Sequence, residues 1–232
     1  MSESVTIDVP PVALEGDLAV PAGATGVVLF AHGSGSGRKS PRNQFVAREL
    51  QSHGIGTLLF DLLTEEEQAD PDEDADLRFD IKQLAARLQG ATDWLTGLPA
   101  LRQESTSLPL GYFGASTGAA AALTAAANRP AEIAAVVSRG GRPDLAAPHL
   151  ARVRAPTLLI VGEADDIVLA LNRRACEKLA GQNQLAVVAN AGHLFEEAGA
   201  LEEVARLSIA WFKRHLANGD THHDDRGARP IY

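Results

Sequence analysis

A Gly-Ala-Ser-Thr-Gly sequence at positions 114–118 constrains the fold more than any other feature of the chain. The apolar run Leu110–Phe113 comes before it and predicts a buried strand, while the alanine-rich segment from Ser116 to Asn128 predicts a helix. A Gly-x-Ser-x-Gly pattern between a strand and a helix is typical of a sharp turn that exposes the serine hydroxyl. Glycine is needed at both positions 114 and 118, because a side chain at either one would crowd this tight turn. The sequence therefore predicts Ser116 as a nucleophile within an α/β chain.

Apolar runs alternate with helical spacing along the rest of the chain and predict the other elements. The expected strands are two within 5–20, separated by Pro10-Pro11, and single strands at 27–31, 56–60, 110–113, 133–138, 157–161 and 184–188. The expected helices cover 44–53, 77–95, 116–128, 144–152, 168–179 and 201–216. The acidic stretch at 65–76 is expected to be a solvated surface excursion, with a flap over the site as the alternative. Strands that alternate with helices imply a mostly parallel sheet of about eight strands with helices on both faces.

Length and composition predict one globular domain. The chain has 232 residues, of which 45% are hydrophobic, and this is enough for a substantial core. We expect the domain to cover residues 1–217 and residues 218–232 to form a disordered tail. The tail contains His222, His223 and two aspartates, but nothing rigid holds these side chains together. We therefore expect no metal site there.

Charge and cysteine content restrict the classes of partner. A formal net charge of -9 argues against nonspecific nucleic-acid binding, which needs clustered positive charge. The single cysteine, Cys176, excludes an internal disulfide and fits a reducing compartment. The first residues lack the features of a secretion signal, and no apolar run reaches the roughly 18 residues of a membrane helix. We therefore expect a cytoplasmic protein that acts on a small molecule and binds neither nucleic acid nor membranes.

Two later loops supply chemical partners for Ser116. Asp165 and Asp166 follow one predicted strand, and His193 follows the next. Because the carboxyl ends of parallel strands meet at one edge of a sheet, we expect these side chains to lie beside the serine. The histidine would take the serine proton, and a carboxylate would orient the imidazole. Asp165 is favoured because it directly follows the strand, while Asp166 stays open as the alternative or as a helix cap.

An acyl-transfer serine also needs N–H groups that stabilise the developing oxyanion. The backbone N–H of Thr117 directly follows the nucleophile, and the glycine-rich loop after the strand at 27–31 offers a second donor, for which we favour Ser34. His32, at the start of that loop, is expected to support the loop rather than to transfer protons. The loop also approaches a phosphate-binding pattern. Arg38 stands where that pattern requires glycine, which disfavours nucleotide hydrolysis.

Arginines near the same edge suggest an anionic substrate. Arg139 and Arg142 follow a predicted strand, and Arg38 and Arg42 lie across the glycine-rich loop. Guanidinium groups bind carboxylates through two parallel hydrogen bonds. The alternatives are that Arg142 pairs with the nearby Asp144 and that Arg139 braces a loop. Phe195 is expected to line an apolar pocket for the acyl group.

These residues together resemble the α/β-hydrolase superfamily. The resemblance runs from the His-Gly loop through Gly-Ala-Ser-Thr-Gly to Gly-His-Leu-Phe-Glu-Glu at 192–197, with Ser, Asp and His in that family's chain order. The size, the lack of a cap domain and the Ala-Gly-His-Leu-Phe sequence are similar to the dienelactone-hydrolase-like branch. True dienelactone hydrolases use a cysteine nucleophile, whereas this chain has Ser116. Its Cys176 lies in a predicted helix without a base partner.

The resemblance implies an α/β-hydrolase fold and a serine carboxylesterase. We expect two-step hydrolysis of a small ester, lactone or thioester by Ser116, His193 and Asp165, with amides of Ser34 and Thr117 as oxyanion donors and no cofactor or metal. One alternative is a binding protein that keeps the triad but turns over negligibly. Another is perhydrolysis or carbon–carbon bond cleavage on the same triad.

Overall fold

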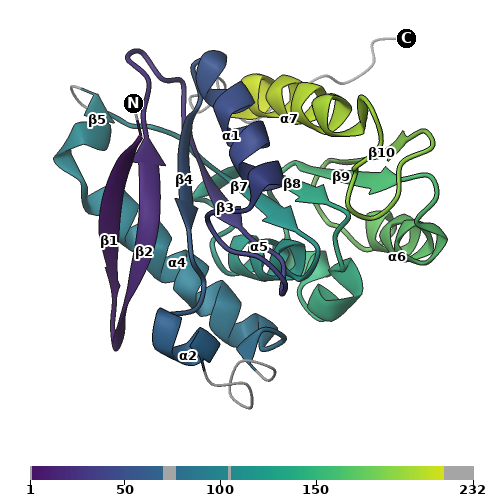
Figure 1. The fold of residues 1–232 in the computed structure, drawn as a ribbon, viewed down its shortest axis with the longest axis horizontal. Coiled ribbons are helices and arrows are strands. Elements are labelled where there is room, and N and C mark those ends of the chain that lie inside the picture. Colours follow the sequence, from purple (N-terminus) through teal and green to yellow (C-terminus); the bar gives the residue numbers. More distant parts are fainter. Residues whose placement is uncertain (1, 70–76, 104–105, 217–232) are drawn as a thin grey trace, which may run out of the picture.

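An eight-stranded sheet forms the centre of the computed structural model, which describes residues 2–69, 77–103 and 106–216 (Figure 1). Its strands are β1 (Glu3–Val9), β2 (Val12–Ala19), β3 (Val27–Ala31), β4 (Gly56–Phe60), β7 (Leu110–Ala115), β8 (Ile133–Arg139), β9 (Thr157–Gly162) and β10 (Asn183–Val188). Their order is β1-β2-β4-β3-β7-β8-β9-β10. The β1–β2 and β2–β4 pairs are antiparallel and the other neighbours are parallel, which confirms the predicted sheet. Short strands β5 (Arg102–Gln103) and β6 (Thr106–Ser107) pair separately.

Helices cover both faces of the sheet, as the alternating pattern predicts. They are α1 (Pro41–Ser52), α2 (Glu65–Ala69), α4 (Ile81–Gly97), α5 (Thr117–Asn128), α6 (Asp166–Cys176) and α7 (Ala200–Leu216). Buried side chains of α1 and α7 pack on one face of the central strands, and those of α4 and α5 pack on the other. The carboxyl ends of β3, β7, β8, β9 and β10 therefore share one edge, between these two layers.

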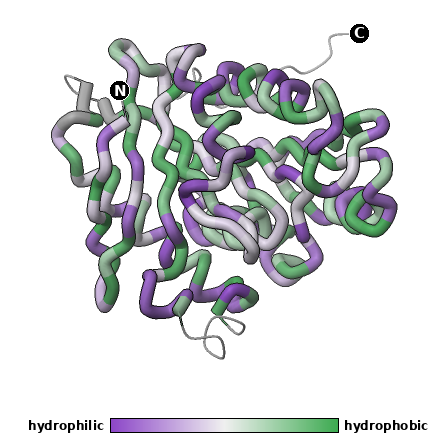
Figure 2. Tube along the Cα trace, in the orientation of Figure 1, coloured by the Kyte–Doolittle hydropathy of each residue, from purple (hydrophilic) through white to green (hydrophobic). Residues whose placement is uncertain are grey.

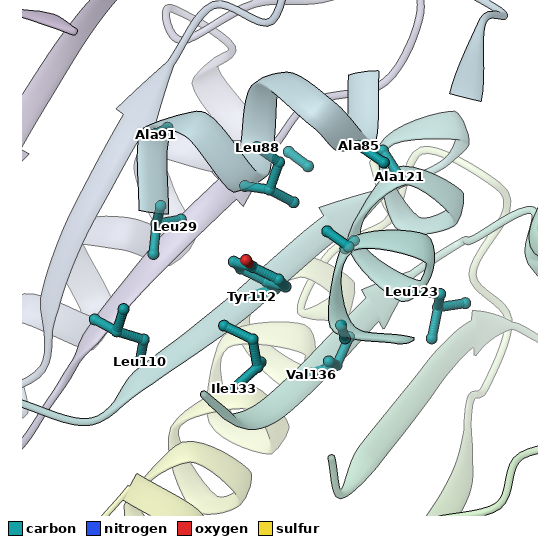
Figure 3. Close-up of a cluster of buried hydrophobic side chains, with 14 of the residues drawn as sticks. Leu29, Ala85, Leu88, Ala91, Leu110, Tyr112, Ala121, Leu123, Ile133 and Val136 are labelled. Carbon is teal, nitrogen blue, oxygen red and sulfur yellow. The ribbon is translucent and has the colours of Figure 1, made fainter. Parts of the chain in front are cut away.

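The core consists of the strands and the inner helix faces. Figure 2 shows hydrophobic residues along the central strands and hydrophilic residues over α2. Every residue of β3, β4, β7 and β9 is buried, as expected for strands covered on both sides. Tyr112 of β7 lies among Leu29, Leu88, Ile133 and other apolar side chains (Figure 3). Its hydroxyl forms a hydrogen bond with that of Thr92 at 2.8 Å, so Tyr112 is a core residue whose one polar group has a partner.

Several element boundaries differ from those expected. The predicted helix at 144–152 consists of two 3-10 helices, Pro143–Ala146 and Leu150–Arg152. Pro148 lies between them, and a proline has no N–H with which to continue the helical hydrogen bonds. Helix α1 begins three residues early because Pro41 suits a first helical turn and Ser40 caps it. Helix α4 begins late because Asp80 accepts the N–H of Gln83 as its cap.

Two predictions fall partly or wholly outside the described residues. The acidic stretch forms α2 over Glu65–Ala69, while residues 70–76 lie outside the described part. The predicted tail at 218–232 also lies outside it. Among the described helices, none is long and apolar enough to cross a membrane.

Candidate active site

Ser116 lies on a strained turn between β7 and α5. Its backbone torsions are φ 52 and ψ -119, which few residues other than glycine adopt. The turn is possible because Gly118 lets α5 approach the end of β3. A Cβ at that position would lie 2.2 Å from the carbonyl oxygen of Ala31 and 2.3 Å from that of His32. The predicted sharp turn is therefore present, and it places the serine at the carboxyl edge of the sheet.

The structure brings His193 and Asp165 to this serine. The Nε2 atom of His193 lies 3.3 Å from the Oγ atom of Ser116. The Nδ1 atom of the same ring lies 2.6 Å from the Oδ2 atom of Asp165. These three side chains come from loops that follow β7, β9 and β10. Their arrangement suits transfer of the serine proton to a histidine whose orientation a carboxylate holds.

The structure also distinguishes between the two candidate aspartates. Asp165 is the N-cap residue of α6, but its side chain makes no capping bond and instead reaches His193. Asp166 is exposed and is the first residue of α6, so this helix begins two residues before the predicted start. The loops carrying the acid and the base are joined, because Ala164 N–H donates to the carbonyl of Ala191 at 2.9 Å.

His32 holds the glycine-rich loop, as the sequence predicts. Its Nε2 atom accepts the N–H of Leu62 at 2.9 Å, so the proton of the neutral ring is on Nδ1, which donates to the carbonyl of Gly33 at 2.9 Å. Burial lowers the pKa of His32, and this favours the neutral ring. A neutral ring with both nitrogens occupied supports the loop and has no site for proton transfer.

An ion pair that sequence reasoning did not predict anchors the same loop. The guanidinium of Arg38 pairs with Asp61, and the backbone N–H of Arg38 donates to Asp61 Oδ1 at 2.7 Å. Asp61 directly follows β4, next to β3 in the sheet. The sequence signal that could have indicated this ion pair is the position of Asp61, a charged residue directly after a buried strand. The Asp61 carboxylate is therefore engaged by Arg38.

Both predicted oxyanion donors, the backbone N–H groups of Thr117 and Ser34, lie next to the Thr117 side chain. This residue begins α5, so its N–H has no acceptor within the helix. The N–H of Ser34 donates to the Oγ1 atom of Thr117 at 2.9 Å. The Ser34 amide therefore lies at the predicted place, but a side chain that the sequence analysis did not consider engages it.

Arg142 and Arg139 differ in whether the structure gives their guanidinium groups a hydrogen-bond partner. Arg142 forms two hydrogen bonds with Asp144, at 2.9 and 2.7 Å, as the alternative interpretation has it. Arg139 is 7% exposed, and its Nε and Nη1 atoms have no hydrogen-bond partner in the described part of the chain. Its guanidinium lies 5.9 Å from the ring centre of the buried Phe195. Burial, together with the nearby Arg42, lowers the pKa of Arg139 to about 10, so it remains charged at neutral pH.

Other candidate groups have no place in this arrangement. Cys176 is half-buried at the end of α6, and burial raises the pKa of its thiol, which disfavours a thiolate nucleophile. Within the residues that the structure describes, no group of three or more histidines, cysteines and carboxylates could hold a metal ion.

Comparison with known proteins identifies the family. A family model described as PET hydrolase-like matches residues 22–226. The chain belongs to this family. This PET hydrolase-like protein is also 55% identical to a dienelactone hydrolase from Anabaena variabilis, whose crystal structure matches with a TM-score of 0.89 over 93% of this chain and 98% of that one. The chain thus belongs to the dienelactone-hydrolase-like type of the α/β-hydrolase fold, and the predicted resemblance is confirmed.

More distant and longer proteins complete the comparison. Est1E from Butyrivibrio proteoclasticus has the same fold, with a TM-score of 0.76 at 14% identity over 93% of this chain and 99% of that one. Two Mycobacterium tuberculosis proteins, provisionally described as phosphoribosyl transferases, are 54% identical over 214 residues. The match covers 92% of this chain but 46% of each relative, so this chain spans about half the length of these curated relatives.

Proposed function

We propose that this hydrolase cleaves a small carboxylic ester, lactone or thioester through an acyl-enzyme intermediate. The observation that carries the proposal is the contact series from Ser116 Oγ to His193 at 3.3 Å and from His193 to Asp165 at 2.6 Å. It begins at a partly exposed serine on a strained turn. A serine hydroxyl is a weak nucleophile unless a base accepts its proton, and this series supplies that base.

Each side chain has a distinct role in the proposed reaction. Ser116 Oγ attacks the carbonyl carbon while His193 Nε2 takes its proton, and Asp165 keeps the remaining ring proton on Nδ1. The imidazolium then protonates the leaving oxygen or sulfur. In the second half, His193 takes a proton from water, the resulting hydroxide attacks the acyl carbon, and Ser116 leaves with that proton.

A serine-directed fluorophosphonate tests the nucleophile. We expect stoichiometric labelling of Ser116, located by peptide mass spectrometry, and loss of labelling in His193→Ala. Failure of the folded wild-type protein to react would contradict the proposal and favour the binding protein with negligible turnover.

The neighbouring aspartates offer a matched pair of variants for the orienting acid. With p-nitrophenyl butyrate as the probe, Asp165→Asn should lower kcat by about 10⁴-fold, because it orients the wrong tautomer of His193. Asp166→Asn carries the same chemical change on an exposed side chain and should retain wild-type kcat. Equal losses in the two variants would contradict the role of Asp165.

We also propose that the substrate carries an anionic group near the acyl carbon, bound by Arg139 and Arg42. Buried charged groups are normally paired, yet two guanidinium nitrogens of Arg139 and the Nε atom of Arg42 are buried without a partner in the described chain. Arg42 Nη1 reaches Glu196 at 3.1 Å, but no carboxylate is bonded to Arg139 among the described residues. The backbone carbonyl of Arg139 accepts the N–H of Ser116 at 3.1 Å, so the two residues are neighbours.

Paired substrates test this anion subsite. Arg139→Met should lower kcat/KM for mono-p-nitrophenyl succinate by about 10- to 100-fold, the worth of a charged hydrogen bond, and leave p-nitrophenyl butyrate unchanged. Arg142→Met should change neither substrate, because Asp144 already holds that guanidinium. Removing an unpaired buried charge should also keep or raise the melting temperature of Arg139→Met. Equal effects on the charged and neutral esters would contradict the subsite.

A further inference from the structure

The side chain of Thr117 has an unused donor at the centre of the proposed oxyanion site. Its Oγ1 atom accepts the N–H of Ser34 at 2.9 Å, and the residue is only 3% exposed. A hydroxyl also carries a proton that it can donate. No acceptor for that proton is found among residues 2–69, 77–103 and 106–216, although buried polar groups normally find partners.

This hydroxyl lies where the nucleophile and the glycine-rich loop meet. A Cβ at Gly33 would lie 3.2 Å from the Cβ of Ser116, so the loop passes close to the nucleophile. The N–H of Thr117 is free of helical bonding, and its hydroxyl engages the second predicted amide donor. The Ser34 N–H could therefore reach an oxygen beside the Thr117 N–H only by giving up its bond to the Thr117 hydroxyl.

We propose that the Thr117 hydroxyl is itself an oxyanion donor. In the transition state the substrate oxygen accepts hydrogen bonds from the N–H and from the Oγ1–H of Thr117, while Ser34 N–H continues to donate to Oγ1. Donation by the amide polarises the hydroxyl and strengthens its own hydrogen bond to a negative oxygen. No proton changes owner in this step. The inference rests on the proposed acyl-transfer function, since only a tetrahedral intermediate places a negative oxygen here.

The same bond has a second consequence for the resting protein. With no substrate present, the hydroxyl satisfies a Ser34 N–H that would otherwise have no partner beside the nucleophile. Ser34 thus acts as a positioning residue through Thr117, while Thr117 contacts the reacting oxygen. The previously expected pair of amide donors becomes one amide and one hydroxyl.

Isosteric variants test this assignment. Thr117→Val removes the hydroxyl and keeps the branched shape, whereas Thr117→Ser keeps the hydroxyl. Thr124→Val is the matched control, because Thr124 is also buried in α5 and its hydroxyl has no hydrogen-bond partner among the described residues. With p-nitrophenyl butyrate, we expect Thr117→Val to lower kcat by about 100-fold at unchanged KM. Thr117→Ser should stay within about threefold of wild type, as should Thr124→Val.

An inhibitor series separates catalysis from loop support. A trifluoromethyl ketone that forms a tetrahedral adduct with Ser116 should bind Thr117→Val about 100-fold more weakly, while the carboxylate product should bind as to wild type. Loss of kcat without loss of adduct affinity would overturn the proposal, because the side chain would then serve the loop alone. A Thr117→Ala variant faster than wild type would also overturn it, since the hydroxyl would be an obstacle to the Ser34 amide.

Two further controls keep the outcome decisive. If Thr117→Val melts well below Thr124→Val, comparison of Thr117→Ser with Thr117→Ala replaces it, with the same 100-fold expectation for loss of the hydroxyl. If the wild type neither reacts with a fluorophosphonate nor binds the ketone, the proposed function fails, and this inference fails with it. If the wild type reacts but Thr117→Val is unaffected, only this inference is wrong.

Discussion

The backbone torsions of Ser116 are unfavourable for every residue except glycine. At φ 52 and ψ -119, a non-glycine residue is strained by about 1–3 kcal/mol. Ser116→Gly should therefore unfold at higher urea than Ser116→Ala, even though glycine adds about 0.4–1 kcal/mol of unfolded-state entropy. Ser52, the last residue of helix α1, provides the opposite control, since Ser52→Ala should be more stable than Ser52→Gly. The same order at both positions would argue against strain at the nucleophile.

His32, which holds the glycine-rich loop, should make the free energy of unfolding depend on pH. Burial lowers its pKa below the ordinary value of 6.5, so on acidification the unfolded chain takes up a proton before the folded one. Its stabilising contribution is present above pH 6.5 and is lost as the pH falls below that value toward the folded pKa. A protonated ring would also leave the Leu62 N–H without its acceptor. His32→Gln should therefore show a shallower loss of unfolding free energy than wild type on acidification from pH 6.5, measured by urea denaturation. Identical slopes would contradict this assignment.

The β7–α5 element depends on close backbone contact at Gly118. A methyl group there would overlap two carbonyl oxygens of the β3 end, and backbone atoms cannot move aside as a flexible side chain can. Gly118→Ala should cost at least about 3 kcal/mol or prevent folding, and should abolish fluorophosphonate labelling. Gly97→Ala, at the end of α4, meets nothing within 4 Å and should change stability by less than about 1 kcal/mol. Thermal denaturation and labelling of both variants measure this difference.

At the scale of the whole molecule, helix α7 closes the second core layer. Phe212 is fully buried and lies against β7, where a Cβ at Gly111 would be 2.7 Å from its ring. Phe212→Ala should lower the unfolding free energy by about 3–5 kcal/mol, because the cavity lies between strands and helix. Phe79 is 60% exposed, and Phe79→Ala should stay within about 0.5 kcal/mol of wild type in the same urea titration. A small loss for Phe212→Ala would mean that α7 is not needed for folding.

The sequence by itself determined the eight strands of the main sheet, most of the long helices, and the loops that carry Ser116 and His193. Apolar periodicity and the Gly-x-Ser-x-Gly turn are local signals, and residues within a few positions of each other decide them. Parallel strands then place the ends of β7, β9 and β10 at one edge, whatever the details of packing. Helix limits were less predictable, because Ser40 and Asp80 are capping signals that apolar periodicity does not register.

Only the tertiary structure decided which partners these side chains have. Asp165 reaches His193 across 28 positions of sequence, and Ser34 reaches Thr117 across 83. Arg142 finds a neighbour two positions away, while Arg139 is buried without one in the described chain. Hydrogen bonds form or fail over tenths of an ångström, and such distances depend on how whole layers pack rather than on local pattern. Spacing along the chain therefore indicates which residues meet at the site, but packing alone sets their pairing.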